Sequence, residues 1–345
     1  MSNSKISARK KEHIEICLTD KILFDKSNGF ENYIFPHNAI TEVDINKIDL
    51  SLKFFDKKIN LPFLISCMTG GTNESKRINE KLAIVASELN IPIGVGSQRQ
   101  ALESQNLHST YKVVRKNAKN VPVLGNIGAA QVADSKNIVD EIKFLIDLVE
   151  ADAMVIHLNP LQELFQKEGE TNFKGLLNNL EKLTCKISIP FIAKEVGSGI
   201  SKDVAKKLLN VGIKGIDVAG SGGTSWAKVE LIRNKMSNEF FGNWGLPTSY
   251  CVRTVSKLKK EYKFVLISSG GITNGIEIAK SIALGADLSA SARIILKEII
   301  NKDVDGVKNL IINMFNDVKK IMYLTGCQNL KELKKIKLIK KSELF

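Results

Sequence analysis

The feature that most constrains the fold is a repeat of short apolar runs, spaced about 30 residues apart. Nearly every run ends in a polar or glycine-rich cluster, and amphipathic segments such as SKRINEKLAIVASEL separate the runs. A strand, a loop and a helix repeated eight times predict a (β/α)8 TIM barrel, an α/β fold whose functional groups sit on the loops after the strands. The runs are LPFLIS (61–66), IPIGVG (91–96), VPVLGN (121–126), AMVIHL (153–158), PFIAKE (190–195), KGIDVA (214–219), FVLISS (264–269) and DLSASA (287–292).

The length of the chain, 345 residues, suits one barrel with additions at both ends. A barrel needs roughly 250 residues. We therefore expect an N-terminal extension at 1–60, the barrel at 61–326 and a charged C-terminal tail at 327–345. In the extension, the segment LSLKFF predicts an extended piece that closes the barrel floor.

Two further segments carry structural expectations. The stretch 227–253 is long for a loop and contains FFGNWGLPTSY, which favours a structured cover over the site. The amphipathic pattern of 303–326 predicts the eighth helix of the barrel.

Composition limits the partners of the chain. The five cysteines are scattered without a CxxC pair, which favours a reducing compartment, the cytoplasm, and argues against a zinc site. The N-terminus lacks an apolar signal region, and no run reaches the roughly 18–20 apolar residues of a membrane span. The net charge is +13, yet aromatic residues make up 6 % and mostly lie away from the basic runs. We therefore expect no nucleic-acid or membrane partner and a polyanionic small substrate.

Two glycine-rich loops predict a phosphate site. SGGI (269–272) follows the seventh strand and GSGGT (220–224) follows the sixth. Glycines let main-chain N–H groups approach a phosphate, and the next helix points its positive end at it. The alternative is an ordinary tight turn. Because the loops are neighbours in a barrel, we expect a phosphorylated cofactor, most simply FMN. The candidate residues are Gly270, Gly271, Ser221 and Thr224.

Other strand ends could contact the flat ring of a flavin. MTGG follows strand one, with Met68, Thr69 and Gly70 as candidates, and Ser97 and Asn126 follow strands two and three. Lys194 closes strand five, where a cation near N1 and O2 of a flavin stabilises the anionic reduced ring. The alternative for Lys194 is a structural salt bridge with Glu195.

The string HLNPLQE (157–163) places four functional side chains after strand four: His157, Asn159, Gln162 and Glu163. His157 could instead be a buried core histidine, and Glu163 a charge favoured at a helix N-terminus. Four such groups within seven residues favour a site. Glu163 is a hard oxygen donor suited to Mg2+, shared with a diphosphate.

Basic residues elsewhere predict a second anion, the substrate. Arginines form paired hydrogen bonds to phosphate oxygens. The alternative for the N-terminal residues is a solvated basic end of a helix. The candidates are Arg9, Lys10, His13 and, in the string SQR, Gln98 and Arg99.

Taken together, these strings resemble type 2 isopentenyl-diphosphate isomerase, the FMN-dependent family. The matching pieces, in family order, are RKKEH, MTGG, GSQR, NIGAAQ, HLNPLQE, KEVG, GSGGTSW, NWGLPT and SGGITNG. The resemblance implies that Gln162, Lys194 and His157 act in catalysis and that Glu163 binds Mg2+. It implies a substrate site of Arg9, Lys10, His13, Ser97, Gln98, Arg99, His157, Asn159 and Gln162. It implies FMN contacts at Met68, Thr69, Gly70, Ser97, Asn126, Lys194, Ser221, Thr224, Gly270, Gly271, Ser289 and Ala290.

The resemblance also implies reduced FMN as the acid and base that shifts a double bond, NADPH as its reductant, and a tetramer or octamer of identical chains. One departure is Ser289-Ala290, where family members usually have Ala-Gly or a similar pair; Ala290 lacks the freedom of glycine.

Two rival functions remain open. An FMN-dependent 2-hydroxy-acid oxidase needs a histidine base late in the barrel, whereas the four histidines of this chain lie in its first half, at His13, His37, His108 and His157. A non-catalytic phosphate- or RNA-binding barrel would use the basic tail, but the polar string HLNPLQE argues against it.

Overall fold

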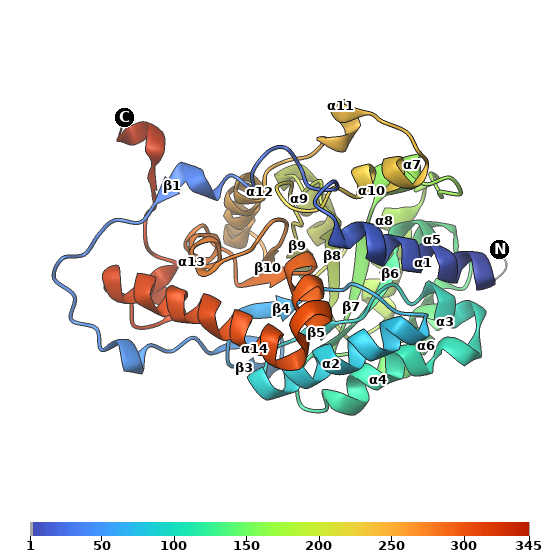
Figure 1. Ribbon diagram of the computed structural model, residues 1–345, viewed down its shortest axis with the longest axis horizontal. Coiled ribbons are helices and arrows are strands. Elements are labelled where there is room, and N and C mark those ends of the chain that lie inside the picture. Colours follow the sequence, from blue (N-terminus) through green and yellow to red (C-terminus); the bar gives the residue numbers. More distant parts are fainter. Residues whose placement is uncertain (1–2, 345) are drawn as a thin grey trace.

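The structure is a computed structural model that describes residues 3–344, with side chains at residue 10 and from residue 12 onward (Figure 1). Its centre is a closed barrel of eight parallel strands, which confirms the predicted fold. The strands in ring order are β4 (Phe63–Ile65), β5 (Ile93–Gly94), β6 (Val123–Gly128), β7 (Ala153–Leu158), β8 (Phe191–Glu195), β9 (Gly215–Asp217), β10 (Val265–Ser268) and β11 (Leu288–Ser291).

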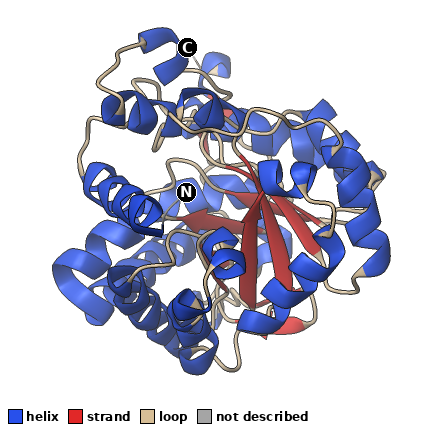
Figure 2. Ribbon diagram, turned by 90° about the vertical axis from the view of Figure 1, so that its right-hand side faces the viewer, coloured by secondary structure: helices blue, strands red, loops and turns tan. Residues whose placement is uncertain are grey.

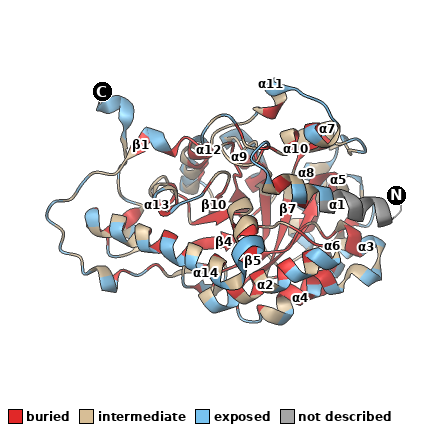
Figure 3. Ribbon diagram, in the orientation of Figure 1, coloured by how far each residue is buried: buried red, intermediate tan, exposed pale blue. Residues whose placement is uncertain are grey.

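Helices surround the barrel on its outside, as Figure 2 shows. Their amphipathic sequences bury one face against the strands and leave the other face exposed (Figure 3). One helix follows each strand: α2 (Asn73–Leu89), α4 (Ser109–Asn117), α6 (Ile138–Val149), α8 (Leu176–Lys186), α9 (Lys202–Asn210), α12 (Thr248–Val255), α13 (Gly275–Ala283) and α14 (Arg293–Leu324). Shorter helices in the loops are α3 (Arg99–Glu103), α5 (Ala129–Asp134), α7 (Pro160–Phe165), α10 (Trp226–Arg233) and α11 (Glu239–Gly242).

Local capping residues explain where several of these helices begin. Thr72 precedes α2 and its Oγ1 accepts a hydrogen bond from Ser75 N at 3.0 Å. Asn274 does the same for α13, where its Oδ1 accepts from Glu277 N at 3.0 Å. Such caps satisfy N–H groups that a helix leaves unpaired in its first turn.

The floor of the barrel is closed by a hairpin of the N-terminal extension. Strands β2 (Leu52–Phe54) and β3 (Lys57–Ile59) pair antiparallel. Phe54 and Ile59 are buried in one cluster with the inward-facing residues of the lower strands, among them Leu124. The structure therefore confirms the extended piece expected at LSLKFF.

The C-terminal part departs from the sequence expectation. The last barrel helix begins at Arg293, earlier than the predicted residue 303, and Asp303 interrupts it with φ 60° and ψ −160°. The segment after it folds back onto the barrel. It contains α15 (Leu330–Leu333) and β12 (Ile339–Lys340), which pairs antiparallel with β1 (Tyr33–Ile34).

Lys334 joins this segment to the barrel floor at Asp287, which also pairs with Lys259 from the connection before β10. Lys334 and Lys259 donate to the two oxygens of Asp287 at 2.5 and 2.6 Å, just before β11. The remaining helix of the extension, α1 (Asn3–Leu18), lies at the opposite end of the barrel and packs against α10 and α14.

Within the described residues, no helix is both long and apolar enough to cross a membrane.

We expect Phe54→Ala to lower the free energy of unfolding by about 3–5 kcal/mol, because it removes a buried aromatic ring from the barrel floor. Phe54 is 1 % exposed. Urea or guanidinium unfolding measures the change, with exposed Lys53→Ala in the same strand as the control. Equal stabilities of the two variants would show that the hairpin does not close the core.

Candidate active site

A cavity of about 440 Å³ opens at the C-terminal ends of the barrel strands. The end of every one of the eight strands, or the loop after it, contributes to its wall, and α1 covers one side with Lys10, His13, Ile14 and Cys17. In a parallel barrel all strands end on the same face, so side chains far apart in the sequence meet there. The extension therefore completes the cavity.

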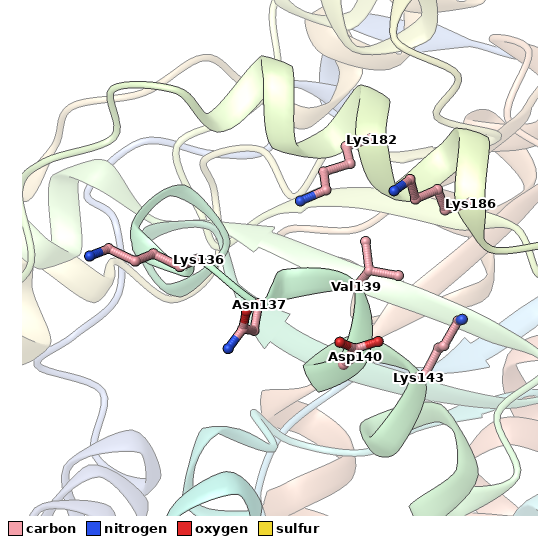
Figure 4. A pocket seen from close by; sticks show the side chains of 7 residues that line it. All are labelled: Lys136, Asn137, Val139, Asp140, Lys143, Lys182 and Lys186. Carbon is pink, nitrogen blue, oxygen red and sulfur yellow. The ribbon is translucent and has the colours of Figure 1, made fainter.

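A second hollow lies on the outer helical layer, between α6 and α8 (Figure 4). Four lysines surround it, and all four are exposed. It shares no lining residue with the main cavity. Its lining residues are Lys136, Asn137, Val139, Asp140, Lys143, Lys182 and Lys186.

The two glycine-rich loops pack against each other at one end of the main cavity. Gly270 has φ 102°, and a Cβ there would lie 2.0 Å from Gly220 O. A Cβ on Gly223 would lie 2.6 Å from Gly271 N. Side chains at these positions would force the loops apart, so glycine is required for the close approach.

The start of α14 lies beside these loops. Ala292 precedes the helix without a side-chain capping bond, and Ala292 and Arg293 both line the cavity. An uncapped helix N-terminus next to a glycine loop provides several main-chain donors for one anion. Ala290 also lines the cavity and adopts no positive φ, so the lack of glycine there costs nothing in backbone freedom.

These observations fit the phosphate of FMN. The glycine cradle would hold the phosphate, and the cavity continues from it to Lys194 and Asn126. Glycines that cannot accept a Cβ and free main-chain donors are the features that a phosphate site needs.

His157 is held in one neutral form by its neighbours. Its Nδ1 lies 2.9 Å from Asn126 Oδ1, and Asn126 Nδ2 donates to Val95 O at 3.2 Å. Because a carbonyl only accepts, the amide NH2 of Asn126 must face Val95, so the His157 proton sits on Nδ1. Burial, with the nearby Lys194 charge, lowers the pKa of His157 to about 4. His157 Nε2 is therefore a hydrogen-bond acceptor at neutral pH.

Lys194 lines the cavity, and its Nζ donates to the main-chain oxygen of Glu195 at 2.8 Å. The Glu195 carboxylate turns the other way and accepts from the main-chain N–H groups of residues 196–199. Burial raises the pKa of Glu195 to about 7, against these hydrogen bonds and the Lys194 charge. The alternative of a side-chain salt bridge between Lys194 and Glu195 does not occur.

The string after β7 forms a hydrogen-bonded polar wall. Asn159 Nδ2 donates to Glu163 Oε1 at 2.9 Å and to Gln162 Oε1 at 3.3 Å. Glu163 Oε2 accepts from Glu170 N at 2.8 Å. Asn159 Oδ1 is buried with no hydrogen-bond partner among the described residues.

The wall offers a metal one carboxylate and one amide oxygen. Among the described residues, no group of three or more His, Cys, Asp or Glu side chains could hold a metal ion. Mg2+ often binds through one or two carboxylates and takes its other ligands from water and substrate phosphates. The residues present therefore fit a shared metal better than a metal held by the protein alone.

Basic groups stand at the mouth of the cavity. Lys10 Nζ donates to Gly70 O, and Arg99 Nη2 lies 2.7 Å from Glu170 Oε1. His13 Nε2 lies 2.9 Å from Glu230 Oε1. The predicted contact of Arg9 lies outside the described residues.

Most of the predicted site residues line this one cavity. Gln98 does not line it: its amide donates to Leu145 O at 2.9 Å and accepts from Asn126 N at 2.9 Å, inside the barrel wall. Ser221 and Ser289 are fully buried behind the lining. Those that line it are Lys10, His13, Met68, Thr69, Gly70, Ser97, Arg99, Asn126, His157, Asn159, Gln162, Glu163, Lys194, Thr224, Gly270, Gly271 and Ala290.

Glu230 was missed by the sequence analysis. It is fully buried, accepts from His13, from Gln162 Nε2 at 3.1 Å and from Arg233 Nη1 at 2.5 Å, and so joins α1, α7 and α10. Burial acts to raise its pKa, but these partners lower it overall, so Glu230 is ionised. The signal available was its position four residues after Trp226 on one helix face, where Trp226 also lines the cavity.

Comparison with known proteins identifies relatives of the whole chain. A family model described as FMN-dependent dehydrogenase matches residues 156–340, more than half of the chain. A curated isopentenyl-diphosphate delta-isomerase of Pelodictyon phaeoclathratiforme is 43 % identical, covering 99 % of each chain. Proteins with the same name from Nostoc sp. and Pyrococcus abyssi are 42 % and 41 % identical, covering 96 % of this chain and 95 % and 91 % of theirs.

Solved structures share the fold at much lower identity. A putative lactate oxidase of Pediococcus acidilactici superposes with a TM-score of 0.69 at 14 % identity, covering 94 % of this chain and 86 % of that one. A flavocytochrome b2 variant gives 0.69 at 17 %, covering 94 % and 81 %. These similarities establish the barrel fold alone.

We expect the contribution of His157 to the free energy of unfolding to increase with pH between about pH 4 and 6.5. His157 has a folded-state pKa near 4 against an ordinary value of 6.5, so the unfolded chain binds more protons in this range. The stabilisation is complete above pH 6.5 and is lost as the pH falls towards 4. Urea unfolding across this range should show less gain in stability with rising pH in His157→Asn than in wild type.

The matched control is His37→Asn, because His37 is exposed. A pH dependence that is identical in wild type and His157→Asn would contradict a buried neutral His157.

Proposed function

The chain belongs to the FMN-dependent, type 2 family of isopentenyl-diphosphate delta-isomerases, and we propose that it interconverts isopentenyl diphosphate and dimethylallyl diphosphate with reduced FMN and Mg2+, as a step of isoprene biosynthesis. The observation that carries the proposal is one cavity with two ends whose residues suit anions. A glycine cradle closes one end, and the basic mouth and polar wall form the other.

The reaction adds one proton to the terminal carbon of the substrate and removes one from C2. When bound, reduced FMN supplies a proton-carrying N5 and an electron-rich ring beneath the developing cation. Lys194 would place its positive charge beside that ring, where it favours the anionic reduced form. In this proposal the protein contributes charge and orientation.

The diphosphate would bind at the other end of the cavity. Lys10, His13 and Arg99 line the mouth and supply positive charge and donors. Glu163, beside the unpartnered oxygen of Asn159, would hold Mg2+ against the phosphates. These contacts lie away from the reacting carbons, so their binding energy serves to orient the substrate.

Gln162 would stand near the reacting carbons with a fixed amide. Its NH2 donates to the ionised Glu230, and its carbonyl accepts from Asn159. An uncharged side chain held in this way can position a proton without leaving a buried charge in the site. His157 Nε2 would accept a hydrogen bond from the substrate side of the cavity.

The finer parts of the proposal follow from the family. NADPH would reduce the bound FMN, the chain would assemble as a tetramer or octamer, and the enzyme would work in the cytoplasm. The alternative 2-hydroxy-acid oxidase remains disfavoured because no histidine follows residue 157 to act as its base.

Activity should depend on a divalent ion held by Glu163. We expect EDTA to abolish turnover and Mg2+ to restore it. Glu163→Gln should raise the Mg2+ concentration for half-maximal activity by about tenfold or more, since a carboxylate ligand becomes a neutral amide. Exposed Glu168→Gln on the same loop is the control. If Glu163→Gln titrates like wild type, the metal binds elsewhere.

A test of the reaction itself separates isomerase from oxidase. The double bond moves without net oxidation, so NADPH or dithionite should be needed only to prime the flavin, in less than one equivalent per product. Product formed in deuterated water should carry solvent deuterium, because both proton steps pass through exchangeable groups. Oxygen should inhibit by reoxidising the flavin. Consumption of one NADPH per turnover would refute the isomerase assignment.

A further inference from the structure

Asp217 is a buried carboxylate with an incomplete set of partners beneath the cavity. It is the last residue of β9 and is 1 % exposed. Its Oδ1 accepts from Ser269 Oγ at 2.5 Å and from Ala219 N at 3.3 Å. Its Oδ2 is buried with no hydrogen-bond partner among the described residues. A buried oxygen without a donor is costly when the group is ionised.

The cation nearest to Asp217 in the strand register is Lys194. The two residues are partners on the adjacent strands β8 and β9, which are about 4.8 Å apart in a sheet. His157 is the partner of Lys194 on its other side. This row of three lies at the strand ends, and Lys194 and His157 reach the cavity wall directly.

We propose that Asp217 is a positioning residue that acts through Lys194: it is ionised while the bound FMN is oxidised, and it takes up one proton when the FMN becomes anionic on reduction. The inference rests on the proposed FMN site. Dithionite would supply two electrons, one proton would go to the flavin and a second proton, from solvent, to the Asp217 carboxylate.

The physical reason is a shortage of positive charge. Lys194 can balance one neighbouring anion in a buried site, but two anions beside one cation leave an uncompensated buried charge. The carboxylate with the poorer hydrogen bonding is the one that neutralises. Burial raises the pKa of Asp217, and the Lys194 charge lowers it. The protonation of Asp217 therefore depends on whether the Lys194 charge also balances a second anion.

The other titratable groups around Lys194 are less suited to this role. Burial raises the pKa of the Cys67 thiol to about 12, so Cys67 is neutral, and His157, with a pKa near 4, is neutral as well. Glu195 is the competitor, with its pKa raised to about 7 by burial. Glu195 follows Lys194 directly in β8, however, so its side chain lies on the opposite face of the strand, whereas Asp217 is the register partner of Lys194 and shares its face.

The experiment measures the midpoint potential of FMN in the holoenzyme from pH 6 to 8.5, without substrate. Wild type should bind two protons per two electrons over part of this range. In the nearly isosteric Asp217→Asn, the pH slope should halve to one proton, and the spectrum should still show anionic reduced flavin. Glu195→Gln should keep the wild-type slope, as should Asp152→Asn, a carboxylate at the barrel floor.

A second variant tests the inference if Asp217→Asn fails to bind FMN. Ser269→Ala removes the donor to Oδ1, so Asp217 should be a weaker acid and the two-proton range should move to higher pH than in wild type. The inference is overturned if the midpoint potential of FMN depends on pH in Asp217→Asn and in Ser269→Ala as it does in wild type. It is also overturned if Glu195→Gln is the one variant whose pH slope is halved.

Failure of the underlying site would look different. Purified protein that binds no FMN, or a Lys194→Ala holoenzyme with an unchanged reduced-flavin spectrum and potential, would refute the proposed function. If Lys194→Ala alters the spectrum or the potential while Asp217→Asn keeps the slope, the FMN site stands and the role of Asp217 falls.

Discussion

The site depends on closure of the parallel sheet. Once β11 pairs with β4, every strand ends on the same rim, and the residues at those ends are fixed relative to one another by main-chain hydrogen bonds. His157, Lys194 and Asp217 occupy matching register positions on three successive strands. Their spacing is therefore set by the backbone rather than by flexible loops. A rigid frame of this kind can hold charges in place without solvent around them.

Burial gives this row its chemistry. A neutral imidazole, an ammonium and a carboxylate occupy neighbouring register positions, and their protonation states are linked because Asp217 is buried and the other two are half-buried. His157 is neutral because of burial and the adjacent positive charge, and Asn126 fixes its tautomer. Lys194 lines the cavity and has the Asp217 carboxylate as its register partner on the next strand. The same cavity has the two glycine-rich loops at one end, where the proposed FMN phosphate would bind, so its charge balance would change with what it binds.

The segments outside the barrel have two different tasks. At the floor, Phe54 and Ile59 fill the core, and Asp287 holds the C-terminal segment through Lys334. At the rim, α1 becomes part of the cavity wall because the ionised Glu230 binds both His13 and Gln162. A single buried carboxylate thus connects the mouth that would meet the diphosphate with the amide proposed to stand near the reacting carbons.

The sequence by itself determined the barrel, because eight apolar runs of strand length alternate with amphipathic helices, and it placed SGGI, GSGGT and HLNPLQE after strands. Hydrophobic periodicity and loop motifs depend on residues that are close together in the sequence, so the sequence alone shows them. The sequence did not show that Gln98 turns into the wall, that α14 starts at Arg293, or that Glu230 and Asp217 lie at the site. Those outcomes depend on which residues of distant segments meet after folding. The hydrogen-bond partners of Glu230 are more than 60 and more than 200 residues away along the chain for Gln162 and His13, and only the packed barrel brings them together.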